Sequence, residues 1–380
     1  MKWLVVLVIA WLAGTAHAYP HYQFSSDSNR CGMCHVAPTG GGPLTQWGRE
    51  EFGETLARGG NGNFLHGAIE LPDWFAVGGD LRFAALANDT GSPEGTELAA
   101  FPMQAELSLG VASGAWSTSV TVGLRGRIRS GAPTSPMSTA SSVESATLTD
   151  YVISREHTIQ WKSEEGGAYV RAGRFAAPHG LRLADHSTYV RRYLGYNLFE
   201  ETYGIGGGWI GDSLEVHATA FVADPLQYAG REEVGGAAMV EWMPTDTIAV
   251  GASTRGGVTS EDVRVSAGAH GKLWFAPGKL LLQAQVDGVR QELRDVGGDR
   301  WQLVGYAGPV WIPMRGVYTG LAYQIFDEDV AVRAVTRQAA DAWISVLPRA
   351  HVELVLSGRA QRLGPHERAY NTMLQVHYNL

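Results

Sequence analysis

The 380-residue chain contains very little cysteine, and its few cysteines lie together. Cys31 and Cys34 are the only two, so a four-cysteine zinc site would lack its second half. Charged residues make up only 18% of the chain and the net charge is −8, which argues against nucleic acid as a partner. From Trp74 onward no stretch of about 20 apolar residues occurs, which excludes a membrane-spanning helix there. The sequence also lacks a nucleotide-binding loop, an HExxH motif and a Ser-His-Asp signature.

The two cysteines belong to a C-x-x-C-H motif that ends at His35. This motif is the attachment signal of a c-type haem, in which the two thiols bond to the haem vinyl groups. His35 would then be the proximal ligand of the iron. A thioredoxin-like disulfide would need a βαβ context, and none surrounds the motif. The sequence therefore predicts one covalently bound haem c.

Residues 1–18 have the pattern of a secretory signal peptide. Lys2 supplies the positive start, residues 3–13 form an apolar core that is too short for a comfortable membrane span, and residues 16–18 form an Ala-His-Ala cleavage site. The mature chain is expected to begin near Tyr19 in an exported compartment, where covalent haem attachment takes place.

Residues 19–72 are predicted to form a small, mainly α-helical haem segment. A helix is expected from Leu44 to Arg58, with Thr45 as its cap and the glycines at 59 and 60 as its end. Its apolar side chains, Phe52 and Leu56 among them, are expected to pack against the porphyrin. A segment of roughly 50 residues buries too little surface to be stable alone, and a bound cofactor remedies this.

The second axial ligand of the haem is open from the sequence. Met33 is the only methionine of the segment, and it lies inside the attachment motif. Histidine is the remaining candidate: His66, after the predicted helix and a glycine turn, is our first choice, and His21 is the alternative. The alternative is that His66 is not a ligand and only caps the linker or stays in water.

Residues 73–380 have a different sequence pattern, in which apolar and polar residues alternate with a period of two. In residues 214–222, for example, Leu, Val and Ala alternate with Glu, His, Thr and Phe. Short turns and longer polar loops also alternate along this part of the chain, which is typical of outer-membrane β-barrels. The sequence predicts an all-β fold: a transmembrane antiparallel β-barrel of about 16 strands, within a range of about 14–18.

Several further features accompany the barrel prediction. The chain ends on a strand, so the first and last strands can pair and leave no open edge. Aromatic residues near strand ends are expected to form interfacial girdles, namely Trp242, Trp274, Phe275, Trp301, Trp311, Trp343 and Tyr378. The long loop at 178–202 is expected to fold inward as a porin constriction loop does. A soluble propeller or tandem sandwich is the alternative, but charged inner faces suit a watery lumen better than a packed core.

The haem motif is followed by Pro38, Leu44-Thr45, Gly48-Arg49 and Phe52. With the signal peptide and the porin-like barrel, this stretch resembles the monohaem cytochrome–porin fusion proteins of the bacterial outer membrane, best known from iron-oxidising bacteria. The resemblance implies that the haem segment lies in or at the periplasmic mouth of the barrel. The residues at 19–24 do not match the usual lead-in of that family, which leaves the electron donor and the direction of flow open.

These features predict an outer-membrane protein that passes electrons across the membrane through one haem. Its expected partners are a periplasmic c-type cytochrome or other electron carrier, an extracellular electron donor or acceptor, and membrane lipid or lipopolysaccharide. Two alternatives stay open: a diffusion porin whose haem segment is a plug or redox gate, and a haem enzyme that acts on a small molecule. Whether the protein is an enzyme, for example one that oxidises extracellular Fe(II), is therefore not decided by the sequence.

Overall fold

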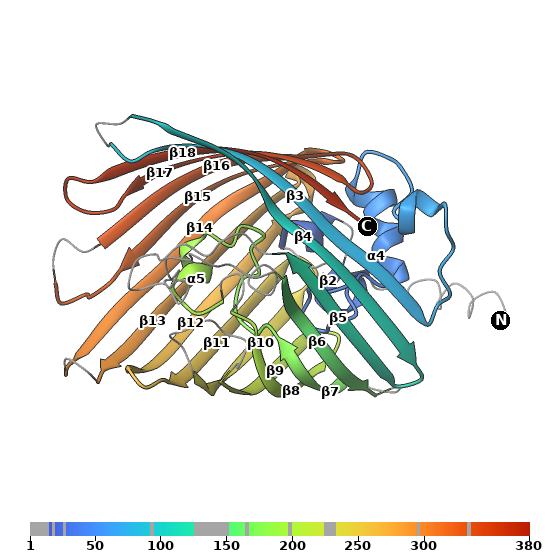
Figure 1. Cartoon of the computed structure of the whole chain (residues 1–380), viewed down its shortest axis with the longest axis horizontal. Helices are drawn as coiled ribbons and strands as arrows, with labels where there is room; N and C mark the ends of the chain where they lie inside the picture. Colours follow the sequence, from blue (N-terminus) through green and yellow to red (C-terminus); the bar gives the residue numbers. More distant parts are fainter. Residues whose placement is uncertain are drawn as a thin grey trace.

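A computed structural model describes residues 15–16, 20–25, 28–91, 95–124, 152–163, 167–196, 200–223, 233–294, 297–332 and 336–380. Sixteen strands form a closed barrel (Figure 1). They are β3 (Phe75–Asp89), β4 (Glu97–Ser113), β5 (Trp116–Leu124), β6 (Val152–Lys162), β7 (Ala168–Phe175), β8 (Thr202–Ile210), β9 (Leu214–Val222), β10 (Val234–Thr245), β11 (Ile248–Val258), β12 (Asp262–Phe275), β13 (Leu280–Leu293), β14 (Asp299–Met314), β15 (Val317–Asp327), β16 (Thr336–Arg349), β17 (Val352–Arg362) and β18 (Arg368–Asn379).

Each strand pairs antiparallel with its neighbours in sequence, and the last strand closes the barrel against the first. β18 pairs with β3 from Tyr370, opposite Asp89, to Asn379, opposite Asp80. Closure satisfies the backbone groups of both edge strands, which a membrane requires. The predicted antiparallel barrel of about 16 strands is confirmed.

The two faces of the barrel wall differ in polarity, as the alternating sequence predicts. On β9, Glu215 and His217 are buried toward the interior, whereas Val216 and Val222 are exposed on the outer face. Interior charges neutralise one another: the carboxylate of Glu241 accepts hydrogen bonds from Lys272 at 2.7 Å and His270 at 2.9 Å. Paired interior charges and an apolar outer band are the pattern of a membrane barrel.

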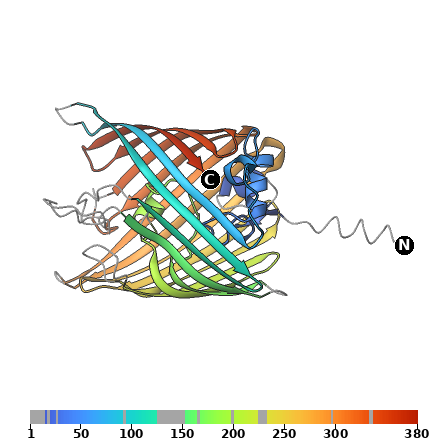
Figure 2. The same ribbon diagram turned by 45° about the vertical axis from the view of Figure 1, so that its right-hand side comes forward.

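The two ends of the barrel differ in the length of their links. At one end, called here the short-turn end, β8 joins β9 through residues 211–213 and β14 joins β15 through residues 315–316. At the other end the links are longer, except for the short one at 259–261. Figure 2 shows the N-terminal segment, in blue, gathered at the short-turn end together with the C-terminus.

The N-terminal segment consists of short elements. They are α2 (Pro20–Ser25), β2 (Ser28–Arg30), α3 (Cys31–Cys34), α4 (Gln46–Glu51), the π-helical turn η1 (Phe52–Leu56) and the 3-10 turn η2 (Phe64–Gly67). The single helix predicted from Leu44 to Arg58 is therefore divided into α4 and η1, although Thr45 caps it as predicted. Within the described residues, no helix is long and apolar enough to cross a membrane.

The predicted signal peptide, residues 1–18, lies outside the described residues except for β1 (Thr15–Ala16), which pairs in parallel with β2. It stays a prediction, as does the boundary of the mature chain near Tyr19.

The aromatic residues near the strand ends divide into two groups. Trp242, Phe275 and Trp311 are about half exposed on the outer face, as a girdle requires. The prediction is wrong for Trp274 and Trp343, which are partly buried and pack against cores that contain Phe24 of the N-terminal segment. These two aromatic side chains hold the segment instead of facing lipid.

Candidate functional site

The C-x-x-C-H motif forms one helical turn at the short-turn end. Cys31 and Cys34 are the first and last residues of α3, and the helical spacing brings both side chains toward one side. Both thiols are buried, and they form no disulfide with each other. The backbone N–H of His35 donates to the carbonyl of Cys31 at 3.0 Å, which places the histidine directly after the turn.

The start of α4 fixes the position of the motif. The backbone N–H of Thr45 donates to the Cys34 carbonyl at 2.8 Å, and the Thr45 hydroxyl donates to the Met33 carbonyl at 2.5 Å. Gly48 passes so close that a Cβ on it would lie 2.8 Å from the Cα of Cys34. A side chain at position 48 would therefore push α4 away from the motif, which gives a physical reason for glycine there.

The ring of His35 is held beside a glycine-rich loop. His35 forms an isolated antiparallel bridge with Leu44, and the carbonyls of Gly41 and Gly42 lie close enough to the imidazole to favour its protonated form. Burial outweighs them and lowers the pKa of His35 to about 4. The ring is thus neutral at neutral pH, which is the form that binds a metal.

The residues present fit a c-type haem. Among the described atoms, His35 Nδ1 is buried and has no hydrogen-bond partner, so the ring has capacity that the protein alone does not use. Burial raises the pKa of Cys31 to about 11 and that of Cys34 to about 12, so both thiols are protonated. Cys31 and Cys34 would hold the haem covalently, and His35 would ligate its iron.

The two candidates for the second axial ligand have other neighbours in the structure. His66 is exposed in η2, where its Nε2 lies 3.4 Å from the Tyr378 hydroxyl and its ring lies 4.4 Å from that of His351. His21 is buried in α2, with its ring 5.6 Å from those of Tyr318 and Trp343. The structure groups Cys31, Cys34 and His35 but does not bring either candidate to them through a described contact, so both assignments stay predictions.

The segment is seated on the turns of the short-turn end. Arg315 donates to the carbonyls of Gly53 at 2.8 Å and Ala57 at 2.5 Å. The N–H of Ala350 donates to the Gly59 carbonyl at 2.7 Å. These bonds satisfy the end of η1 and join the segment to two different turns of the barrel.

An apolar cluster, called here the seating cluster, supports these hydrogen bonds. It comprises Phe52, Leu56 and Ala57 of the segment and Ile312, Tyr318, Leu347 and Ala350 of the barrel. Phe52 and Leu56 are covered by side chains of the barrel wall, a partner that the sequence did not indicate, and their contact with a porphyrin stays a prediction. Sequence periodicity identified both residues as apolar but carries no information on which partner covers them.

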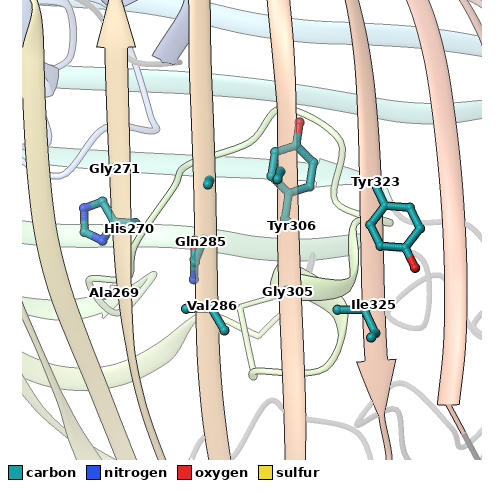
Figure 3. A pocket seen from close by; sticks show the side chains of 11 residues that line it. Ala269, His270, Gly271, Gln285, Val286, Gly305, Tyr306, Tyr323 and Ile325 are labelled. Atoms are coloured by element: carbon teal, nitrogen blue, oxygen red, sulfur yellow. The ribbon is translucent and has the colours of Figure 1, made fainter.

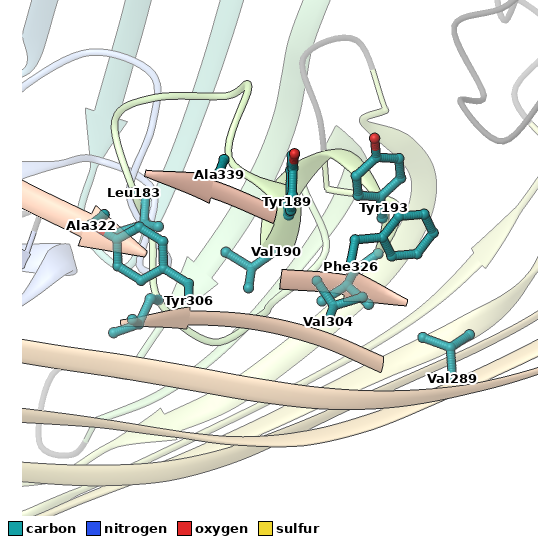
Figure 4. Close-up of a cluster of buried hydrophobic side chains, with 12 residues drawn as sticks. Leu183, Tyr189, Val190, Tyr193, Val289, Val304, Tyr306, Ala322, Phe326 and Ala339 are labelled. Atoms are coloured by element: carbon teal, nitrogen blue, oxygen red, sulfur yellow. The ribbon is translucent and has the colours of Figure 1, made fainter. Parts of the chain in front are cut away.

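The long link between β7 and β8 folds into the barrel, as predicted. The N–H of Leu181 donates to the Gln285 side chain at 2.8 Å, and the ring of Tyr193 stacks on Phe326 with centroids 3.8 Å apart. Figure 4 shows the apolar cluster that the link forms with the wall, and α5 (Tyr189–Arg192) is its one helical turn in the described residues. In Figure 1 the link, with α5, lies inside the ring of strands.

Arg182 of this inward link reaches the haem motif. A Cβ placed on Gly40 would lie 3.0 Å from Arg182 Nη1 and 3.8 Å from Cys31 Sγ, so the two groups border the same point. Glu156 of β6 borders the next glycine, Gly41, at 3.2 Å from its ideal Cβ. Sequence reasoning identified the loop that contains Arg182 but missed this contact, since no local pattern reports a meeting of residues about 150 positions apart.

A shallow groove lies on the outward face of β12 to β15 (Figure 3). Small residues such as Ala269 and Gly305 line it beside Val286 and Tyr323, which are about half exposed. The groove is apolar and outward-facing, whereas the haem motif lies at the short-turn mouth, so it is not part of the haem site.

Comparison with known proteins places the fold. No family model matches the chain, and no curated protein matches its sequence. Solved structures do resemble it at low sequence identity. The anion-selective porin from Comamonas acidovorans has a TM-score of 0.59 at 9% identity, covering 80% of this chain and 99% of the porin.

Two further porins give the same result. Salmonella typhi OmpF in complex with daunomycin has a TM-score of 0.60 at 9% identity, covering 82% of this chain and 100% of OmpF. OmpT of Vibrio cholerae has a TM-score of 0.56 at 10% identity, covering 82% of this chain and 100% of OmpT. The chain therefore has the fold of an outer-membrane porin: a closed antiparallel barrel of 16 strands.

Proposed function

We propose that the protein resides in the outer membrane and passes electrons across it through one haem c bound by Cys31, Cys34 and His35. The observation that carries this proposal is the position of the haem motif. It lies in the mouth of a closed barrel and borders Arg182 of the inward link, so a cofactor held by Cys31 would be bound between the mouth and the lumen. The haem would supply one-electron exchange between Fe(II) and Fe(III).

The porin-like fold supports one orientation of the protein in the membrane. Outer-membrane barrels have short turns on the periplasmic side and longer loops outside. The haem segment would then face the periplasm, where a c-type cytochrome or other carrier is the partner. An extracellular donor or acceptor would reach the haem from the long-loop side, and membrane lipid or lipopolysaccharide would surround the outer face.

The second candidate function is a diffusion porin whose haem segment is a plug or a redox gate. The inward link and the likeness to an anion-selective porin support it, because a narrowed lumen is what a diffusion porin uses for selection. The two candidates differ in what crosses the barrel: electrons in one case and solutes in the other.

Paired measurements on the Cys31→Ala variant distinguish the two candidates. We expect the variant to lose haem staining and to keep a heat-modifiable barrel on gels. Under the electron-transfer proposal, ion conductance in a planar bilayer is low in the wild type and stays low in the variant. A wild-type conductance that is high and changes with the redox state of the haem would favour the gated porin.

A further inference from the structure

The inward link supplies a cation to the haem motif, and its backbone holds that cation in place. Leu181, directly before Arg182, donates its N–H to Gln285 Oε1 at 2.8 Å. Leu183, directly after it, accepts a hydrogen bond of 2.7 Å from Arg191. Both leucines are buried. The position of Arg182 is thus fixed on either side before any ligand binds, which lowers the entropic cost of binding one.

Arg182 itself is not committed to another group of the protein. In the part of the chain that the structure describes, this half-buried guanidinium has neither a hydrogen bond nor an ion pair. Glu156 lies beside Gly41, but among the described residues it forms no ion pair with Arg182. The charge of Glu156 acts on Arg182, but the guanidinium donates to no described carboxylate, so its donors are available for one.

The second cation whose charge acts on the Cys31 thiol, and the arginine of α4, already have partners. Lys272, whose charge also acts on the Cys31 thiol, donates to Glu241 at 2.7 Å and to Gln23 at 2.9 Å. Arg49 of α4 donates to the Leu44 carbonyl at 3.1 Å. Arg182 is therefore the cation beside Cys31 that is best placed to accept a new anionic partner.

A c-type haem brings two carboxylates into the site. Because an anion that leaves water needs a compensating cation, a haem carboxylate at the buried motif requires a charged donor. We propose that Arg182 binds a haem propionate and so ties the inward link of the barrel to the haem. This inference rests on the proposed function, and it adds a residue outside the haem segment that tunes the reduction potential.

The proposal predicts the sign of a change in potential. A positive charge near the haem disfavours the ferric state, which carries one more positive charge than the ferrous state, so Arg182 raises the reduction potential. Removing the charge should shift the Fe(II)/Fe(III) equilibrium toward Fe(III) by about tenfold, which corresponds to about 59 mV for one electron.

The test is a spectroscopic redox titration of the full-length, haem-loaded protein in detergent. We expect Arg182→Ala and Arg182→Gln to lower the midpoint potential with unchanged haem content, and Arg182→Lys to restore most of it. Arg192→Ala is the matched control: it removes a positive charge from the same link and should leave the potential unchanged. Heat-modifiability on gels confirms that each barrel is folded.

Three outcomes would overturn the inference. Equal potentials in the wild type and in a folded Arg182→Gln variant would remove Arg182 from the site. A wild-type potential that changes when phosphate replaces chloride at constant ionic strength, with no such change in Arg182→Gln, would assign Arg182 to a soluble anion. A wild-type protein without covalent haem would instead contradict the proposed function itself.

Discussion

The Nζ of Lys272, on the luminal face of β12, donates a hydrogen bond of 2.9 Å to the Oε1 of Gln23 in the N-terminal helix α2. The neighbouring Tyr22 hydroxyl lies 3.5 Å from Glu353 of β17, on another part of the wall. The N-terminal segment is thus bonded to polar residues of the barrel interior and not only to the rim. These bonds fix the position of the N-terminal segment, and therefore which residues of the barrel interior a haem bound to it would contact.

Weakening the seating cluster should loosen the haem segment without unfolding the barrel. Leu56 is buried against barrel residues, so Leu56→Ala should destabilise the docked segment by about 2–5 kcal/mol. Limited proteolysis of the segment measures the effect. Leu65→Ala is the control, because Leu65 belongs to the same segment but is exposed. Equal cleavage rates in both variants would show that the cluster does not hold the segment.

The second axial ligand can be assigned by spectroscopy. His66 is exposed, with a hydrogen bond of 3.4 Å to Tyr378 and its ring beside that of His351, whereas His21 is buried among aromatic rings, so moving His66 to the iron disturbs less buried packing. We expect His66→Ala to convert a low-spin haem to high spin in absorption and EPR spectra. His21→Ala should leave it low-spin. The reverse pattern would assign the ligand to His21, and two unchanged low-spin spectra would exclude both histidines.

Acid should weaken the anchoring of the inward link. Burial, with the positive charges of His270 and Arg255 adding to it, lowers the pKa of His179 well below its usual 6.5. The folded link therefore binds fewer protons than the unfolded one below that pH. Its stability is fully present above about pH 6.5 and falls as the pH decreases further. The protection factor of the Leu181 N–H, near His179, should therefore be lower at pH 5 than at pH 7; it is the intrinsic exchange rate divided by the observed rate.

The control for this pH effect is the His179→Gln variant, which removes the titrating group. The protection factor at Leu181 should lose most of its dependence on pH in this variant. A wild-type exchange rate at Leu181 that follows only the intrinsic chemistry of exchange would contradict the role of His179.

Much of the fold could be predicted from the sequence, because the strands of a barrel wall produce a local alternation of apolar and polar residues. Alternation along residues 214–222 reports which face each side chain takes, and the lengths of the links report the two ends of the barrel. The inward course of the loop at 178–202 was also predictable, because a link of that length and tyrosine content needs a surface to cover it.

The parts that sequence reasoning missed depend on contacts between distant residues. Trp274 and Trp343 look like girdle residues because they lie near strand ends, yet they are on the luminal face of the wall, where the N-terminal segment covers them. In the sequence, Arg182 is one of several charged residues of a loop, and only the fold shows that it lies beside Cys31. Periodicity gives the face of each residue, but it does not give the distant segment that covers the two tryptophans or the contact of Arg182 with the motif.

Electron transfer across liposomes tests the central claim most directly. The full-length protein is reconstituted with a redox dye trapped inside and an impermeant reductant outside, and the absorbance of the dye is followed with time. The account predicts that the haem-loaded wild type reduces the dye, and that Cys31→Ala, with a folded barrel but no haem, does not. Equal rates in the two proteins, or no reduction by a wild type that carries haem, would contradict it.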